Sequence, residues 1–147
     1  MLDYVPADPP AYYQCFFQAA NMYTLPPVLL PAIAKVEGGE VGKSNGNKNG
    51  SRDHGKMQIN DVWVSQLNKS FGITAEMIRN DPCLAIRSAG YILRYHINRA
   101  GGDFWQGVGR YHSATPSLHA AYIQKVFVAA KTLEPTYQAL AYRLAMN

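Results

Sequence analysis

Residues 81–102 have the sequence DPCLAIRSAGYILRYHINRAGG, and this stretch does most to decide the fold. Asp81 is of a type that caps helix N-termini, and Pro82 follows at the first helical position, where no backbone N–H is needed. Small and apolar residues then recur along one helical face: Cys83, Ile86, Gly90, Leu93 and Ile97. The glycine pair 101–102 ends the pattern. We therefore expect a long helix that buries one face.

Apolar spacing and capping residues predict further helices on both sides of this one. Before it, the expected helices cover residues 11–24, 28–36, 61–71 and 74–80. After it, they cover residues 103–111, 117–133 and 138–146. Proline ends or kinks a helix, so Pro135 is expected to separate the last two.

Glycine and asparagine dominate residues 38–53, which have almost no large apolar side chain and are expected to form a flexible loop. Residues 55–60 alternate partly in polarity, as a short strand does. The fold class indicated is mainly α (α+β), a bundle of about six to eight helices with at most a small β-hairpin or extended segment near residues 51–60. Three prolines in residues 1–10 indicate an extended N-terminal arm.

The composition is that of a single folded domain. The chain has 147 residues, of which 48% are apolar and 16% charged, a balance that argues against intrinsic disorder. The net charge is +4, without any block of like charges, so nucleic-acid binding is not indicated. The longest apolar runs, such as residues 127–130, are far too short to span a membrane.

Two cysteines, Cys15 and Cys83, lie too far apart for a CxxC motif or a zinc site of Cys and His. Two buried thiols and one long-range disulfide are equally compatible with the sequence. The four histidines have no metal-binding spacing, and neither a GxSxG nucleophile elbow nor a phosphate-binding glycine loop is present. We therefore expect neither a metal nor a cofactor.

Glu37 is the acidic residue best suited to chemistry. It comes at the C-terminal end of the second expected helix, beside the apolar residue Ile33. Partial burial and the negative end of the helix dipole would both raise the pKa of its carboxyl group, as a general acid requires. Gly38 and Gly39 leave room for a bulky ligand. The alternative is a solvated glutamate at a frayed helix end.

A second carboxylate, which most glycosidases need, is not evident from the sequence. Asp53 and Asp61 are the nearby candidates. Asp61 is more simply interpreted as an acid in the first turn of a helix, and the role of Asp53 is open. The aromatic residues are expected to lie mostly in the core: Trp63, Tyr91, Tyr95, Trp105, Tyr111 and Tyr122.

Three motifs, in the same order along the chain, resemble those of the soluble lytic transglycosylase superfamily. Residues 32–39, AIAKVEGG, resemble its catalytic glutamate motif, and residues 55–60, GKMQIN, resemble the motif GLMQI. Residues 109–114, GRYHSA, lie where the family has AYNAG. The similarity covers residues 11–130 and is greatest to small specialised enzymes of conjugation, type IV pilus and secretion systems. That branch carries a cysteine in the first helix and a later Asp-Pro-Cys, so the resemblance implies a Cys15–Cys83 disulfide.

The resemblance also implies a lysozyme-like fold, with residues 11–133 as the catalytic domain. From the residue pattern, residues 134–147 are expected to form a C-terminal helix packed on this domain, and docking of a partner is the alternative role of this helix. It implies cleavage of peptidoglycan between N-acetylmuramic acid and N-acetylglucosamine, with formation of 1,6-anhydromuramyl ends. Glu37 would act first as the acid and then as the base. Substrate contacts would come from Met57, Gln58, Asn60, Tyr111 and His112, and Tyr111 would also position the Glu37 carboxyl.

By the same resemblance, the protein would be a monomer of the periplasm or cell envelope that opens the wall for a secretion, conjugation or pilus apparatus. No basic segment followed by an apolar run opens the chain. A disulfide requires an oxidising compartment. If Cys15 and Cys83 are paired, the absence of such a segment therefore means that a secretion signal is missing from this sequence, and it does not indicate a cytoplasmic protein.

Three positions depart from the family pattern: Gly38 replaces serine, Lys56 replaces leucine and His112 replaces asparagine. Two alternatives therefore stay open. A goose-type-like lysozyme would hydrolyse the strand with Glu37 and a second carboxylate such as Asp53. A peptidoglycan-binding module with little catalytic activity is the other, and the glycine at position 38 favours it.

Overall fold

The computed structural model describes residues 9–112 and 115–146, so residues 1–8 of the expected N-terminal arm lie outside the described part of the chain. Within that part there are seven helices and three short strands. The prediction of a mainly α, lysozyme-like fold is confirmed.

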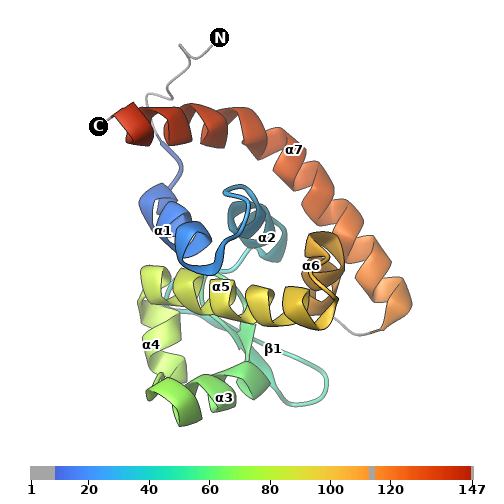
Figure 1. The fold of residues 1–147 in the computed structure, drawn as a ribbon. Coiled ribbons are helices and arrows are strands. Elements are labelled where there is room, and N and C mark those ends of the chain that lie inside the picture. Colours follow the sequence, from blue (N-terminus) through green and yellow to red (C-terminus); the bar gives the residue numbers. More distant parts are fainter. Residues whose placement is uncertain (1–8, 113–114, 147) are drawn as a thin grey trace.

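The helices are α1 Tyr13–Tyr23, α2 Leu29–Glu37, α3 Asp61–Phe71, α4 Ala75–Asn80, α5 Pro82–Arg99, α6 Phe104–His112 and α7 Pro116–Met146. α5 crosses the middle of the molecule, with α1 and α2 on one side and α3, α4 and the strands on the other (Figure 1). It contacts α1, α2, α4 and α6. Its inner residues Ile86, Leu93 and Ile97 are accordingly buried, so the helix predicted first is the centre of the core.

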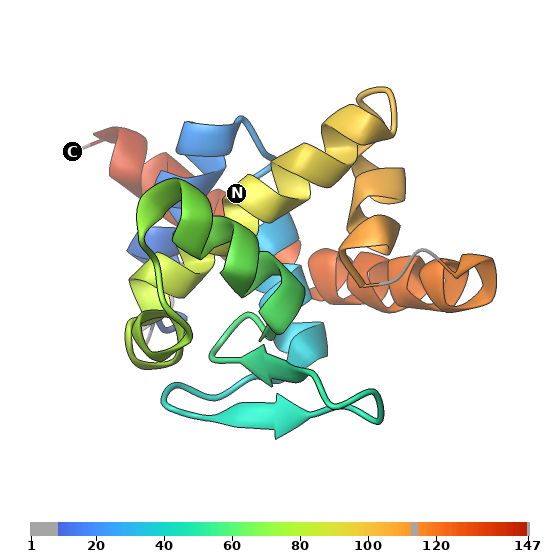
Figure 2. The same cartoon turned by 90° about the horizontal axis from the view of Figure 1, so that it is seen from below.

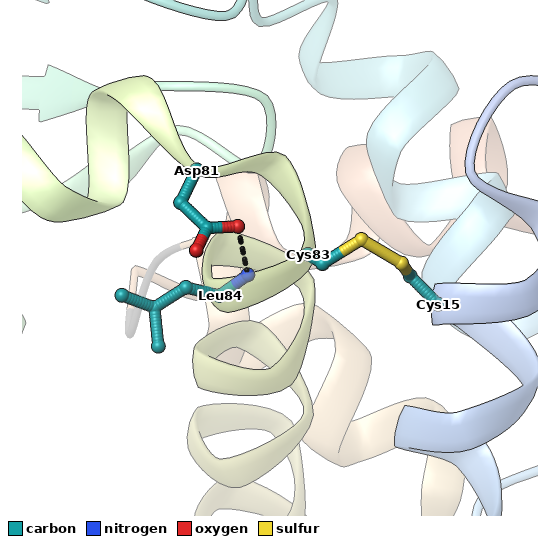
Figure 3. Close-up of a disulfide and its surroundings, with 4 residues drawn as sticks. All are labelled: Cys15, Asp81, Cys83 and Leu84. Atoms are coloured by element: carbon teal, nitrogen blue, oxygen red, sulfur yellow. Dashed lines mark hydrogen bonds between the residues drawn. A yellow bond between two sulfur atoms is a disulfide. The ribbon is translucent and has the colours of Figure 1, made fainter.

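The start of α5 has the predicted cap. The Leu84 backbone N–H donates to Asp81 Oδ1 at 3.0 Å (Figure 3). Pro82 occupies the first turn. α3 and α4 begin in the same way, because Asn60 accepts from the Val62 N–H and Thr74 accepts from the Met77 N–H. Such caps satisfy backbone donors that a helix leaves open, which explains why these three helix starts could be predicted closely.

A disulfide joins Cys15 of α1 to Cys83 in the first turn of α5, as the family resemblance implied (Figure 3). The two Cα atoms are 5.4 Å apart, and the bond closes a sequence separation of 68 residues. A crosslink of this span stabilises the fold by about 4 kcal/mol in the chain-entropy model. It fixes α1 against the central helix.

The expectation of a flexible loop over residues 38–53 is wrong from residue 44 onward, because that part forms a hairpin. Its strands are β1 Ser44–Gly46 and β2 Arg52–His54, and with β3 Ile59–Asn60 they form an antiparallel sheet in the order β1-β2-β3 (Figure 2). The turn is held by polar groups: the Asn47 N–H donates to the Ser51 carbonyl, and the Ser51 N–H donates to Asn49 Oδ1. Alternation of apolar residues therefore could not reveal this hairpin.

The segment expected to be extended, residues 55–60, is extended only at β3. Residues 55–58 form a turn in which the Gln58 N–H donates to the Gly55 carbonyl at 3.2 Å. Gln58 has a φ of 54°, in the left-handed region that few residues other than glycine adopt. The chain reverses there and enters α3 directly from β3.

The break predicted at Pro135 is also wrong. Residues 116–146 form one helix, α7, with Pro135 inside it, so the segment 138–146 continues this helix instead of forming a separate one. A proline in a helix interior costs about 3 kcal/mol, which packing must offset. Tyr137 and Leu140, just beyond the proline, are buried, and the Tyr137 ring lies 5.6 Å from that of Phe17. α7 changes direction as it arches past α1 and α2 (Figure 1).

No helix in residues 9–112 and 115–146 is both long and apolar enough to cross a membrane. Over the same residues, no three His, Cys, Asp or Glu side chains are grouped as a metal site would require.

Candidate active site

A cleft of about 300 Å³ is lined by the hairpin, the turn before α3 and residues of four helices. It brings together most of the site residues expected from the sequence: Glu37, Gln58, Asn60, Tyr111 and His112. Asp53, whose role was open, lines the same cleft. The other lining residues are Asn47, Asn49, Ser51, Ile59, Trp63 and Ile92. Ser113 and Ala114 of the third motif lie outside the described residues.

Glu37 is the last residue of α2 and reaches the cleft from the core side. Residues 29–34 of that helix are buried, so the helix holds the carboxyl group against the protein interior. Burial raises the pKa of Glu37 to about 6, the nearby charge of Asp53 adds to this rise, and a hydrogen bond from Tyr122 opposes it. Near neutral pH a carboxyl group with this pKa is protonated far more often than an ordinary glutamate, so it can donate a proton to a leaving group.

The two glycines after Glu37 determine the path of the chain at the cleft. Gly38 ends α2 with a φ of 64°, and its N–H donates to the Ala34 carbonyl. Any side chain at Gly39 would collide with the carbonyl groups of Gly55 and Lys56. The chain after Glu37 therefore passes directly against the Gly55 turn, and this contact joins the first two sequence motifs.

Tyr122 makes the contact to Glu37 that the resemblance assigned to Tyr111. The Tyr122 hydroxyl donates to Glu37 Oε2 at 2.7 Å, and the side chain is 4% exposed. Tyr111 instead donates to the Met57 carbonyl at 3.0 Å. Tyr122 is buried in the core, as expected from the sequence, but no sequence motif indicates that its hydroxyl contacts Glu37. Packing of α7 against α2 brings the hydroxyl to the carboxyl.

His112 stacks on the Tyr122 ring, with the ring centres 4.5 Å apart and the planes 5° from parallel. Partial burial lowers the pKa of His112, as does the positive charge of Lys125, while Asp53 raises it. The neutral imidazole is therefore favoured near neutral pH. The histidine that replaces the family asparagine thus covers the tyrosine that holds Glu37.

Asn60 organises the cleft through bonds within the protein. Its Nδ2 donates to Asp53 Oδ1 at 2.9 Å and to Ser51 Oγ at 3.0 Å, while its Oδ1 caps α3. Gln58 is similarly engaged, since it donates to the Gly55 carbonyl and accepts from Asn45. Both side chains line the cleft, and their amides fix the hairpin that forms one of its walls.

Met57 does not reach the cleft. Its side chain is 0% exposed and belongs to the hydrophobic core, so only its carbonyl group acts near the site, as the acceptor for Tyr111. The contact between Met57 and substrate that the resemblance implied stays a prediction, and with this side chain in the core it would fall to the backbone of Met57.

A buried histidine supports the hairpin from behind, and sequence analysis missed it. His54 is 3% exposed, and its Nε2 lies 2.6 Å from Asp61 Oδ1. Arg79 can only donate, so its bond to His54 Nδ1 makes that atom the acceptor and leaves Nε2–H to donate to Asp61. The His54 contact and the Arg52 N–H hold the pKa of Asp61 below its usual value. Asp61 lies in the first turn of α3, as expected, and ties that helix to β2.

The comparison with protein families agrees with this geometry. The family model described as "Transglycosylase SLT domain" matches residues 14–132. The chain belongs to the transglycosylase SLT domain family. The matched range includes both cysteines, Glu37 and the residues that line the cleft, and it confirms the resemblance found in the three motifs.

Several curated proteins are similar to this SLT-domain chain. "Protein IpgF" of Shigella flexneri is 39% identical over 103 residues, covering 69% of this chain and 66% of that protein. "Invasion protein IagB" of Salmonella typhimurium is 34% identical over 106 residues, covering 71% of this chain and 65% of that protein. "Peptidoglycan-binding-like protein" of Escherichia coli O157:H7 is 33% identical over 125 residues, covering 78% and 74%. The chain thus spans about 65% of the length of the Shigella and Salmonella relatives.

Proposed function

We propose that this protein is a peptidoglycan lytic transglycosylase that cleaves the bond between N-acetylmuramic acid and N-acetylglucosamine. The observation that carries the proposal is the state of Glu37. Its side chain is partly buried, burial raises the pKa of its carboxyl group to about 6, and Tyr122 holds the group at the wall of a cleft rich in amide side chains. Membership of the SLT family supplies the substrate class.

In the first step, the Glu37 carboxyl group donates its proton to the glycosidic oxygen, and the bond from that oxygen to C1 of the muramyl sugar breaks. The substrate's own N-acetyl group stabilises the positive charge that develops at C1, a known departure from the two-carboxylate scheme. Tyr122 stabilises the Glu37 carboxylate that results, because a hydroxyl donor favours the charged form.

In the second step, the Glu37 carboxylate accepts the proton of the C6 hydroxyl group while that oxygen bonds to C1. The product is a 1,6-anhydromuramyl end, and no water is consumed. Glu37 finishes protonated, ready for the next bond, so one group with a pKa near neutrality serves as acid and then as base.

Hydrolysis is the second candidate, because Asp53 lines the same cleft. Asn60 orients the Asp53 carboxylate, and its charge adds to the burial that raises the pKa of Glu37. In a hydrolase, Asp53 would activate a water molecule and leave a reducing end. Against this, the transglycosylase scheme needs no second carboxylate, and the SLT family model matches most of the chain.

We further propose that the protein works in the periplasm or cell envelope, opening peptidoglycan locally for a secretion, conjugation or pilus apparatus. Disulfides persist in oxidising compartments, and this chain has one between Cys15 and Cys83. The name of one relative, "Invasion protein IagB", is compatible with a role at such an apparatus.

Digestion of purified murein sacculi tests the proposed activity. The soluble products are analysed by mass spectrometry for wild type, Glu37→Gln and Asp53→Asn. We expect anhydromuramyl ends from wild type and from Asp53→Asn, and none from Glu37→Gln. Reducing ends that need both carboxylates would select the hydrolase. Glycan binding by all three proteins without turnover would select a binding module, the activity suggested by the name of the Escherichia coli relative.

A further inference from the structure

A second cavity, of about 170 Å³, continues the cleft on the other side of Glu37. Glu37 and His112 line both cavities, so together they form the boundary between the two. The other lining residues of the second cavity are Val36, Leu118, Ala121, Tyr122 and Lys125. The last four share one face of α7, since they are spaced at three and four residues along the helix.

The two cavities differ in charge. The main cleft is lined by the carboxyl groups of Glu37 and Asp53, and no lysine or arginine is among its lining residues. The second cavity has Lys125 of α7 on its wall, and Glu37 lines the same cavity. No ion pair joins Lys125 to an acidic side chain in the described part of the chain. Its positive charge already acts across this cavity, because it lowers the pKa of His112.

We propose that the second cavity receives a carboxylate of the muramyl unit, with Lys125 as its counter-ion. The inference rests on the proposed function, since it takes a peptidoglycan strand as the ligand. In such a strand the two sugars alternate, and the muramyl sugar alone carries a lactyl group. That group bears either its own free carboxylate or, when substituted, a peptide with carboxylates. Both sources present the same chemistry to Lys125.

The apolar part of the cavity matches the rest of that group. Leu118 is exposed and lies two helical turns before Lys125, so it can contact the lactyl methyl group or the first alanine-sized side chain of a peptide. The Asp53 carboxylate, which lines only the main cleft, would repel the same anion. The charge difference across Glu37 therefore sets which way the alternating strand lies, and favours peptidoglycan over a neutral polymer of N-acetylglucosamine.

Binding measured in the inactive Glu37→Gln background tests this inference without turnover. Three tetrasaccharides serve as probes: a peptide-bearing peptidoglycan fragment, the same fragment after an amidase has removed the peptide, and a neutral N-acetylglucosamine oligomer. Calorimetry compares Lys125→Ala with the matched control Lys131→Ala. Lys131 lies on the same helix, over the Phe127 ring and outside both cavities. Both substitutions remove one positive charge.

We expect Lys125→Ala to reduce the preference for the anionic probes over the neutral one by about two- to fivefold, as for a solvent-exposed ion pair. The loss should shrink at high salt, and Lys131→Ala should leave the preference unchanged. Loss with the peptide-bearing probe alone assigns the carboxylate to the peptide, and loss with the amidase-treated probe alone assigns it to the lactyl group. Loss with both anionic probes shows that Lys125 binds the carboxylate of either source. Equal preference in Lys125→Ala and Lys131→Ala would overturn the inference.

The outcome separates this inference from the proposed function. If wild type releases anhydromuramyl products but Lys125→Ala keeps the preference, the inference fails and the function stands. If wild type releases none while the preference depends on Lys125, the function fails and the carboxylate site stands.

Discussion

The hydroxyl group of Tyr122 controls the proton on Glu37, and Tyr122→Phe removes it with little change of shape. The bond to Glu37 Oε2 is 2.7 Å long and lies where Tyr122 is 4% exposed. A hydrogen bond to a charged group contributes about 1.5–3 kcal/mol net. This bond favours the carboxylate and opposes the burial that raises the pKa to about 6. At about 1.4 kcal/mol per pKa unit, its loss should raise the pKa of Glu37 by about one to two further units.

The assay is the pH dependence of kcat/KM for release of anhydromuramyl products, since this quantity reports the free enzyme. The first step needs protonated Glu37, so activity should fall as pH rises through the pKa of about 6 in wild type. In Tyr122→Phe the fall should begin at least about one pH unit higher. The maximal rate should also decrease, because the carboxyl group loses the contact that orients it.

Tyr137→Phe is the matched control. Tyr137 is also buried on α7, but its ring packs against Phe17 and it makes no hydrogen bond to Glu37. We expect its pH profile to equal that of wild type. An alkaline limb that stays in place or moves to lower pH in Tyr122→Phe would refute the reasoning.

Three further outcomes follow from the structure. Burial raises the pKa of Glu37 to about 6 from an ordinary 4.5, so the folded protein loses stability as pH rises from 4.5 to 6. Glu37→Gln removes this loss and should raise the free energy of unfolding at neutral pH by up to about 2 kcal/mol. Urea unfolding should show no such gain below pH 4.5, and an equal gain at both pH values would contradict this origin. Replacing Cys15 and Cys83 by alanine should lower the free energy of unfolding by about 4 kcal/mol in the same assay, whereas a change below about 1 kcal/mol would show that the crosslink contributes little. Asp53→Asn should shift the alkaline limb of activity to lower pH, because its charge adds to the effect of burial on Glu37; an unchanged limb would show that this charge does not reach the site.

Local signals in the sequence were enough to predict much of the helical framework. Asp81 and Pro82 begin α5, and Asn60 begins α3, because capping is a contact between near neighbours in the chain. The position of Glu37, the proposed general acid, was also predictable, since the end of α2 follows from the apolar spacing before it and the glycines after it. These features depend on residues only a few positions apart.

Contacts between distant segments were not predictable from residues alone. Tyr122 reaches Glu37 across 85 residues of sequence, and no local pattern distinguishes it from a tyrosine of the core. The continuity of α7 through Pro135 depends on packing of Tyr137 against Phe17, which lies near the other end of the chain. Met57 matched a motif position expected to contact substrate, yet the turn around Gln58 directs its side chain into the core.

Digestion of sacculi in water enriched with oxygen-18 tests the central claim most directly. If Glu37 acts as acid and then as base on the C6 hydroxyl group, the strand is cut without water. We then expect the new muramyl ends to be unlabelled and lighter by one water than hydrolysed ends. Incorporation of one oxygen-18 atom at each new end would contradict the account and show that water attacks C1.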